Sequence, residues 1–163
     1  MFRPRVLLCA ASCLLLGLTG CEATGMGWIP SRLVPGDKAT FGFDVVTDPT
    51  TYDSSFSGSY QDPQGMMSNG KVVSVDFKGT GMLHKAPPPP GAPPVKGGCL
   101  QGAPNYQSTN PAMPGSGQLT LSICDLDGNG AGAGDYILLQ VLDGPYALYQ
   151  NFGEAHGNIT VKQ

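Results

Sequence analysis

The sequence contains few charged residues and few of the side chains that most often bind metals or catalyse reactions. Charged residues make up 13% of the 163 residues, and only two histidines and two glutamates occur. Twelve acidic residues outnumber nine basic ones, so no basic surface is expected that would hold nucleic acid. His84 and His156 are 72 residues apart. A zinc site would therefore need carboxylate ligands, and we expect both histidines at the surface.

No apolar run in the sequence is long enough to span a membrane as a helix, and the longest one lies at the N-terminus. Val6 to Leu18 is a Leu-rich run of thirteen residues that follows Arg3 and Arg5. A transmembrane helix needs about 20 apolar residues, whereas the apolar part of a secretory signal needs about 7–15. Residues 1–20 are therefore predicted to be a signal peptide.

The signal ends in Leu18-Thr19-Gly20-Cys21, which resembles a bacterial lipobox. In such a motif the small residues fit the peptidase and the thiol of the cysteine accepts the acyl group. We expect cleavage before Cys21 and attachment to the membrane through lipid on Cys21, because several acyl chains give stable anchoring. An ordinary signal peptide cut elsewhere and an uncleaved anchor are the alternatives.

The predicted location is therefore an exported, lipid-anchored and extracytoplasmic one. Glu22 follows the cysteine, where inner-membrane lipoproteins of Gram-negative bacteria usually have Asp, so an outer-membrane address is favoured in a Gram-negative host. Residues 21–37 are predicted to form a short tether. Part of this tether could fold onto the domain, because it contains the motif from Gly25 to Ile29.

The abundant residues favour an exported β-domain. The 24 glycines and 15 prolines argue against long helices. Cys99 and Cys124 remain as a pair once the signal is removed and Cys21 carries lipid, and an oxidising compartment favours a disulfide between them. Such a bridge would contribute about 3 kcal/mol on the chain-entropy model. Two buried free thiols are the alternative.

The spacing of apolar residues predicts strands over most of residues 38–163. Alternation with a period of two begins at Lys38 and recurs in about seven short segments separated by turn residues, with no convincing helix after the signal. We therefore expect an all-β fold, a single antiparallel β-sandwich or flattened barrel. Residues 85–117 are rich in Pro and Gly and are expected to be an irregular insertion. The strands are expected at residues 39–45, 54–60, 73–77, 119–123, 136–142, 146–151 and 158–162.

Several short motifs resemble, in the same order, those of a bacterial surface-protein family. Thr24-Gly25-Met26-Gly27-Trp28-Ile29 and Lys38-Ala39-Thr40-Phe41-Gly42-Phe43 are similar to the opening of the post-COAP-1 domain, which follows choice-of-anchor domains. Phe77 to Gly81, Gly134 to Asp143 and Tyr149 to Asn151 resemble later steps of that family. The resemblance implies an extracytoplasmic β-domain and brings no catalytic residues. The insertion at 85–117 and the two cysteines depart from the family's pattern.

One loop has the composition of a calcium site. Asp125, Asp127 and Asn129 alternate before Gly130, and Asp135 could add a fourth oxygen ligand. The Glu and flanking helices of an EF-hand are absent from the sequence pattern. The alternative is a polar, Gly-rich hairpin, in which Asp and Asn simply favour turns.

No motif selects an enzyme activity, and a non-catalytic envelope module of unknown ligand is the leading interpretation. The Ser116 context lacks the spacing of a nucleophile elbow, although a small secreted hydrolase with a triad assembled in space stays open. A calcium-dependent module that binds glycans or another ligand is the second alternative. Partners in the envelope and the oligomeric state are left open. The tyrosines that could stack on sugars, or pack in the core, are Tyr52, Tyr60, Tyr106, Tyr136, Tyr146 and Tyr149.

Overall fold

The computed structural model describes the β-domain and not the predicted signal peptide. The described residues are 22–32, 35–48, 50–51, 53–67, 71–81, 84–85, 98–126 and 134–162. Side chains are described for these residues except 63–67, 71–72, 79–81 and 84–85. Cys21, Asp127 and Asn129 therefore lie outside the described residues, as do the expected signal and Tyr52.

The described part of the chain is all-β apart from one 3₁₀ turn, η1 (Gly144–Tyr146). None of it is a helix with the length and apolar character needed to cross a membrane. The strands are β1 (Glu22–Pro30), β2 (Lys38–Thr47), β3 (Ser54–Met67), β4 (Lys71–Gly81), β5 (His84–Lys85), β6 (Cys99–Gly102), β7 (Asn105–Ser108), β8 (Ser116–Cys124), β9 (Tyr136–Val141), β10 (Gln150–Glu154) and β11 (His156–Lys162).

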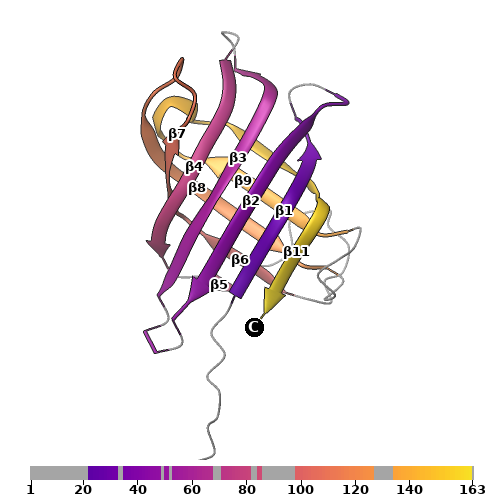
Figure 1. The fold of residues 1–163 in the computed structure, drawn as a ribbon, viewed down its shortest axis with the longest axis vertical. Helices are drawn as coiled ribbons and strands as arrows, with labels where there is room; N and C mark the ends of the chain where they lie inside the picture. The colour runs from indigo at the N-terminus through magenta and orange to yellow at the C-terminus, as the bar shows by residue number, and fades with distance from the viewer. Residues whose placement is uncertain are drawn as a thin grey trace, which may run out of the picture.

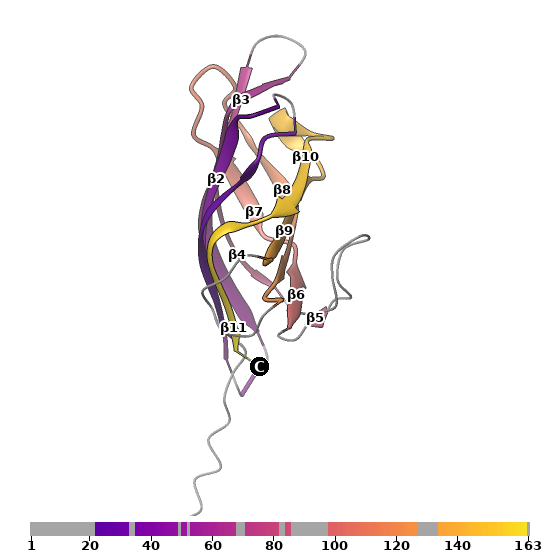
Figure 2. The same cartoon turned by 90° about the vertical axis from the view of Figure 1, so that its right-hand side faces the viewer.

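The strands form two layers that pack face to face, as Figure 1 and Figure 2 show. One layer has the order β11-β1-β2-β3-β4-β7 and the other the order β10-β9-β8-β6-β5, with antiparallel pairing throughout. The first is called sheet A below and the second sheet B. The predicted class, an antiparallel sandwich or flattened barrel, is confirmed, with eleven strands among the described residues where about seven were expected.

Two strands pass between the layers and give the sandwich its barrel-like closure. β8 pairs with β7 of sheet A through residues 116–118 and with β9 of sheet B through residues 119–124. On the other side, β10 of sheet B continues through Ala155 into β11 of sheet A. Each side of the sandwich is therefore joined by a strand that changes sheet, which leaves few unpaired edges.

The core follows from the alternation that the sequence displays. In β2, Ala39, Phe41, Phe43 and Val45 are buried while the residues between them face solvent or are half-buried. Inward residues of β8 and β9 meet them from sheet B, so both sheets contribute one layer of side chains to a single core. Burying these side chains is the main driving force for the fold.

Three phenylalanine rings are packed where glycine leaves room for them. The Phe43 ring contacts Gly25 of β1, the Phe77 ring contacts Gly58 of β3, and the Phe56 ring contacts Gly102 of β6. A Cβ atom at any of these glycines would overlap the ring. The contact between Phe43 and Gly25 joins the two sequence motifs at residues 24–29 and 38–43, because Gly25 and Phe43 are directly paired across β1 and β2.

The segment expected to be a tether is instead a strand with a partner on each side. β1 pairs with β2 on one edge and with β11 on the other over most of its length. Its inward positions are Ala23, Gly25, Gly27 and Ile29, and two glycines at inward positions hide the apolar alternation in the sequence. The expectation that part of this segment folds onto the domain describes the structure better than a tether does.

Two further segments differ from the sequence expectations. The insertion at 85–117 contains β6 and β7, which are short but paired, and so it is not wholly irregular. The strand expected at 146–151 begins only at Gln150, because Gly144 to Tyr146 form the turn η1 first. Short strands rich in Gly, Asn and Gln give little apolar signal, since their partners supply the stability.

We expect Gly58→Ala to lower the free energy of unfolding by about 1–3 kcal/mol, the usual cost of overpacking a core. The added methyl group would meet the Phe77 ring and the Gly42 carbonyl oxygen, and the backbone oxygen cannot rotate away. Urea unfolding measures the change. Gly42→Ala is the matched control, because nothing lies within 4 Å of a Cβ there. Equal destabilisation by the two substitutions would contradict this account.

Candidate functional site

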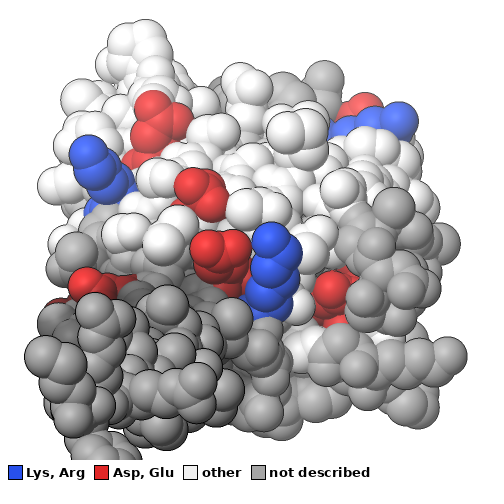
Figure 3. Space-filling model, turned by 60° about the horizontal axis from the view of Figure 1, so that its bottom comes forward, with Lys and Arg blue, Asp and Glu red and all other residues white. Residues whose placement is uncertain are grey.

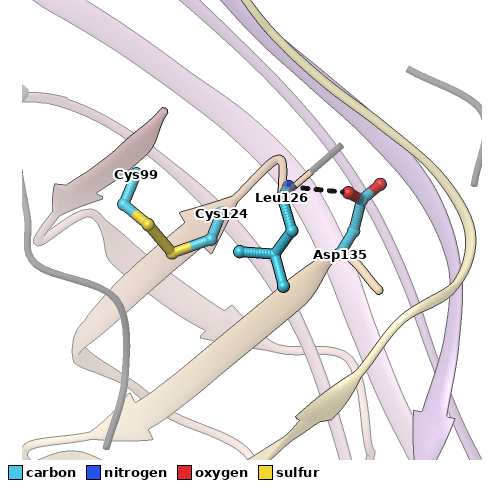
Figure 4. Close-up of a disulfide and its surroundings, with 4 residues drawn as sticks. All are labelled: Cys99, Cys124, Leu126 and Asp135. Atoms are coloured by element: carbon cyan, nitrogen blue, oxygen red, sulfur yellow. Dashed lines mark hydrogen bonds between the residues drawn. A yellow bond between two sulfur atoms is a disulfide. The ribbon is translucent and has the colours of Figure 1, made fainter. Parts of the chain in front are cut away.

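The predicted disulfide between Cys99 and Cys124 is confirmed. The two cysteines lie opposite each other in β6 and β8, with Cα atoms 4.1 Å apart. Leu126 and the half-buried Tyr136 pack against the bridge, as Figure 4 shows for Leu126. The bridge holds the short strand β6 in sheet B, where only four residues pair with β8.

Asp125 and Asp135, two of the four predicted calcium ligands, are buried and accept hydrogen bonds from backbone N–H groups. Asp125 Oδ2 accepts from Val161 at 3.2 Å. Asp135 Oδ1 accepts from Leu126 at 3.1 Å, as drawn in Figure 4, and its Oδ2 accepts from Ile159 at 3.3 Å. Only 2% and 1% of the two side chains are exposed.

These carboxylates join sheet B to the outer edge of β11. The backbone of β11 pairs with β1 on one side only. Asp125 follows β8 and Asp135 precedes β9, so their carboxylates take the place of a neighbouring strand for Ile159 and Val161. An unpaired buried N–H group is costly, and a charged acceptor satisfies it well. The sequence pattern that suggested calcium ligands therefore has a structural use at these two positions.

Within the described ranges, no group of three or more His, Cys, Asp or Glu side chains is arranged to hold a metal ion. The other two predicted calcium ligands lie outside these ranges. His84 lies in β5 of sheet B, and His156 begins β11 of sheet A. His156 is exposed, as expected.

We expect Asp135→Asn to lower the free energy of unfolding by about 1–3 kcal/mol, because the new amide group would face a backbone N–H that needs an acceptor. Thermal unfolding followed by circular dichroism measures the loss. Asp76→Asn is the control, since Asp76 is exposed on β4. If Asp135 serves only to accept hydrogen bonds, the substitution should lower the free energy of unfolding equally in the presence of calcium and of a calcium chelator. A loss seen only with calcium would instead favour an ion at this loop.

A second buried polar cluster joins the two sheets near the opposite end of the sandwich. Tyr149 donates a hydrogen bond to Asp62 Oδ2 at 2.8 Å, and the hydroxyls of Tyr149 and Tyr60 are 2.7 Å apart. Asn151 donates to the Tyr60 hydroxyl at 2.8 Å, and Ser31 donates to Asp62 Oδ2 at 3.0 Å. The cluster therefore connects β3 of sheet A with the residues at the start of β10.

The polar groups of this cluster are buried in the interior of the sandwich. Asp62 is 0% exposed, Tyr60 is 1% exposed and Tyr149 is 4% exposed. Asp62 Oδ1 has no hydrogen-bond partner among the described groups. Burial raises the pKa of Tyr60 and of Tyr149 well above the usual range, and the neighbouring Tyr60 and Asp62 raise that of Tyr149 further. A substrate in solution would not reach these groups, so the arrangement favours a structural role.

Sequence reasoning did not find this cluster, because its members are far apart in the chain. Asp62 and Tyr149 are separated by 87 residues, and Tyr60 and Asn151 by 91. The available signal was the position of Tyr60 on the apolar side of a predicted strand. Nothing in the sequence paired it with Tyr149.

We expect the protein to lose stability as the pH rises above about 10, the pKa of tyrosine in an unfolded chain. The folded state keeps Tyr60 and Tyr149 protonated because their pKa values are raised, so the unfolded state releases protons first and its free energy falls relative to that of the folded state. Tyrosinate absorbance and circular dichroism should therefore show that buried tyrosines, Tyr60 and Tyr149 among them, ionise only as the chain unfolds.

Tyr149→Phe should be less stable than the wild type at neutral pH and should show a weaker loss above pH 10, because one buried hydroxyl is removed. Tyr136→Phe is the control, since no hydrogen bond of its hydroxyl is seen within the described part of the chain. Free titration of all tyrosines in the folded wild type would contradict the raised pKa values.

Two groups of aromatic and basic side chains lie near the crossing from β10 into β11: His156 and Lys38 contact Trp28, and Arg32 contacts Phe152. We call these five residues together the Trp28 cluster. The His156 ring stacks on Trp28 with centroids 3.9 Å apart, and Lys38 Nζ lies 4.1 Å from the centroid of the indole. Arg32 lies over the Phe152 ring at 5.8 Å. Phe152 is 47% exposed. Aromatic and arginine side chains are common in protein interfaces.

The geometry of Trp28 bears on the glycan alternative. β11 and β2 flank β1 on opposite sides, so His156 and Lys38 cover the two faces of the indole. A sugar ring stacks on an open aromatic face, and this one is occupied by the protein's own side chains. Four of the predicted tyrosines, Tyr60, Tyr106, Tyr146 and Tyr149, are buried in the core. A sugar-stacking surface is therefore not formed by these residues.

Comparisons with known proteins give no relative. No family model, curated protein or solved structure matches this chain. The resemblance to the post-COAP-1 domain stays a prediction that rests on the sequence motifs.

Proposed function

We propose that this protein is a lipid-anchored component of a bacterial cell envelope whose β-sandwich is a non-catalytic structural or interaction module. The observation that carries the proposal is the sequence Leu18-Thr19-Gly20-Cys21 placed directly before the first strand, which begins at Glu22. Acylated Cys21 would attach a folded domain to the membrane with no intervening stalk. The disulfide supports an oxidising, extracytoplasmic location.

The use of the polar side chains supports a non-catalytic module. Asp125 and Asp135 hold β11, and Asp62, Tyr60 and Tyr149 connect the sheets inside the core. The exposed Trp28 cluster offers contacts suited to a partner molecule of the envelope. The order of motifs along β1 and β2 supports a domain similar to the post-COAP-1 family.

We expect Cys21→Ser to abolish lipid labelling and to move the protein from the membrane to the soluble fraction, because the thiol is the acyl acceptor. Metabolic labelling with a fatty acid and fractionation measure this, and the lipoprotein signal-peptidase inhibitor globomycin should leave the precursor uncut. The control substitution must leave the fold unchanged, so Ser31, which belongs to the buried polar cluster around Asp62, is avoided. Ser59→Ala, on the exposed face of β3, should behave as the wild type. Unchanged membrane association of Cys21→Ser would remove the proposal.

A further inference from the structure

The start of β1 fixes which end of the sandwich lies next to the point of lipid attachment. Glu22 is the first residue of β1 and pairs with Val46 of β2 and Lys162 of β11. Consecutive Cα atoms are about 3.8 Å apart, so the lipid on Cys21 would begin within a few Å of this row. The C-terminal end of β11, the end of β2 at Thr47 and the start of β3 at Ser54 lie at the same end (Figure 1). We call this the Glu22 end.

From these positions we infer that the sandwich stands on the bilayer on its Glu22 end, with the surface of the lipid headgroups as the partner of that end. This inference rests on the proposed lipid anchor. β1 has nine residues, and a strand rises about 3.3 Å per residue, so Pro30 lies about 26 Å along the strand from Glu22, on the side away from the headgroups. The Trp28 cluster, at the far end of β1, is thereby turned away from the membrane.

The charges at the Glu22 end favour attachment through the lipid anchor and not through attraction of basic residues to anionic lipid. Glu22 and Lys162 form an ion pair at 3.5 Å. Exposed Asp48 and Asp53 lie in or beside the β2–β3 connection. In Figure 3 the described part of this end carries red and blue side chains side by side, with no continuous blue area. A basic patch would attract anionic lipid independently of acylation, and these residues do not supply one.

The two broad faces of the sandwich are less suited to lie on lipid. The outer face of sheet A carries polar and charged side chains, for example Thr40, Ser57 and Lys78. Its two exposed large apolar side chains among the described residues, Met26 and Val46, are separated along β1 and β2, and Val46 lies at the Glu22 end. On the outer face of sheet B the exposed apolar side chains Leu148 and Phe152 belong to the half of the molecule far from Glu22. Leu148 N and Val141 O are 3.2 Å apart in the turn after η1, and Asn151 contacts Pro30, which ends β1.

Fluorescence quenching at four introduced cysteines tests the orientation. The acylated protein is placed in phosphatidylethanolamine–phosphatidylglycerol vesicles that contain headgroup-spin-labelled lipid, and a fluorophore is attached to Thr50→Cys, Ser59→Cys, Ala112→Cys or Gln140→Cys. Thr50 lies at the Glu22 end, Ala112 in the β7–β8 connection at the far end, and Ser59 and Gln140 on the faces of sheets A and B. All four residues are exposed, and the native pair Cys99–Cys124 is already bridged.

The expected result is quenching at Thr50 several-fold stronger than at the other three sites. Quenching at Ser59 or Gln140 as strong as at Thr50 would mean that the sandwich lies on a face, and equally weak quenching at all four sites would mean that it is held away from the membrane. Either result overturns the orientation. Mass spectrometry of the N-terminal peptide decides separately whether Cys21 carries lipid, so failure of the anchor is distinguished from failure of the orientation.

Discussion

The outer edge of β11 is the place where the closure of the sandwich depends on individual side chains. β11 is the last strand of sheet A, and its backbone pairs with one neighbour, β1. An edge strand with unpaired N–H groups next to a buried core would be unstable and prone to pair with other chains. Asp125 and Asp135 remove this difficulty by accepting hydrogen bonds from Val161 and Ile159. The loop between β8 and β9 is thus tied to the last strand.

The contact between the two aspartates and β11 also connects several features that are distant in the sequence. Asp125 follows Cys124 directly, so the disulfide that holds β6 also lies beside the residue that holds β11. Asp135 also accepts a bond from Leu126, and Leu126 packs on the disulfide. At the other end of the sandwich, Asp62 and Tyr149 make the corresponding connection between the sheets. Two buried polar groups of residues therefore fix how the layers lie on each other, while the apolar core supplies the driving force between them.

The sequence predicted the parts of the fold that apolar alternation specifies. β2, β8, β9 and β11 have β-branched, leucine or aromatic residues at inward positions, and each was expected near its observed place. β1 was expected to be a tether because Gly25 and Gly27 occupy inward positions and give no apolar signal. The Phe43 ring fills the space beside Gly25, and the backbone of β11 approaches Gly27 closely. β6 and β7 were not predicted, because they are four-residue strands in a Gly- and Pro-rich segment and show little apolar alternation. Their stability comes from the strands that pair with them.

The candidate site was harder to predict, because local motifs and distant contacts use the same residue types. Asp125 and Asp135 suggested calcium on spacing alone, and only the position of β11 shows that their oxygens have backbone donors nearby. The joining of Tyr60, Asp62 and Tyr149 requires that β3 and β10 face each other, which no short pattern specifies. Because these polar residues are buried between the layers that they hold together, their side chains are not accessible to a ligand in solution. The proposed lipid on Cys21 beside Glu22 would determine which part of the outer surface is accessible, since lipid at this end would leave the Trp28 cluster at the other end open to a partner.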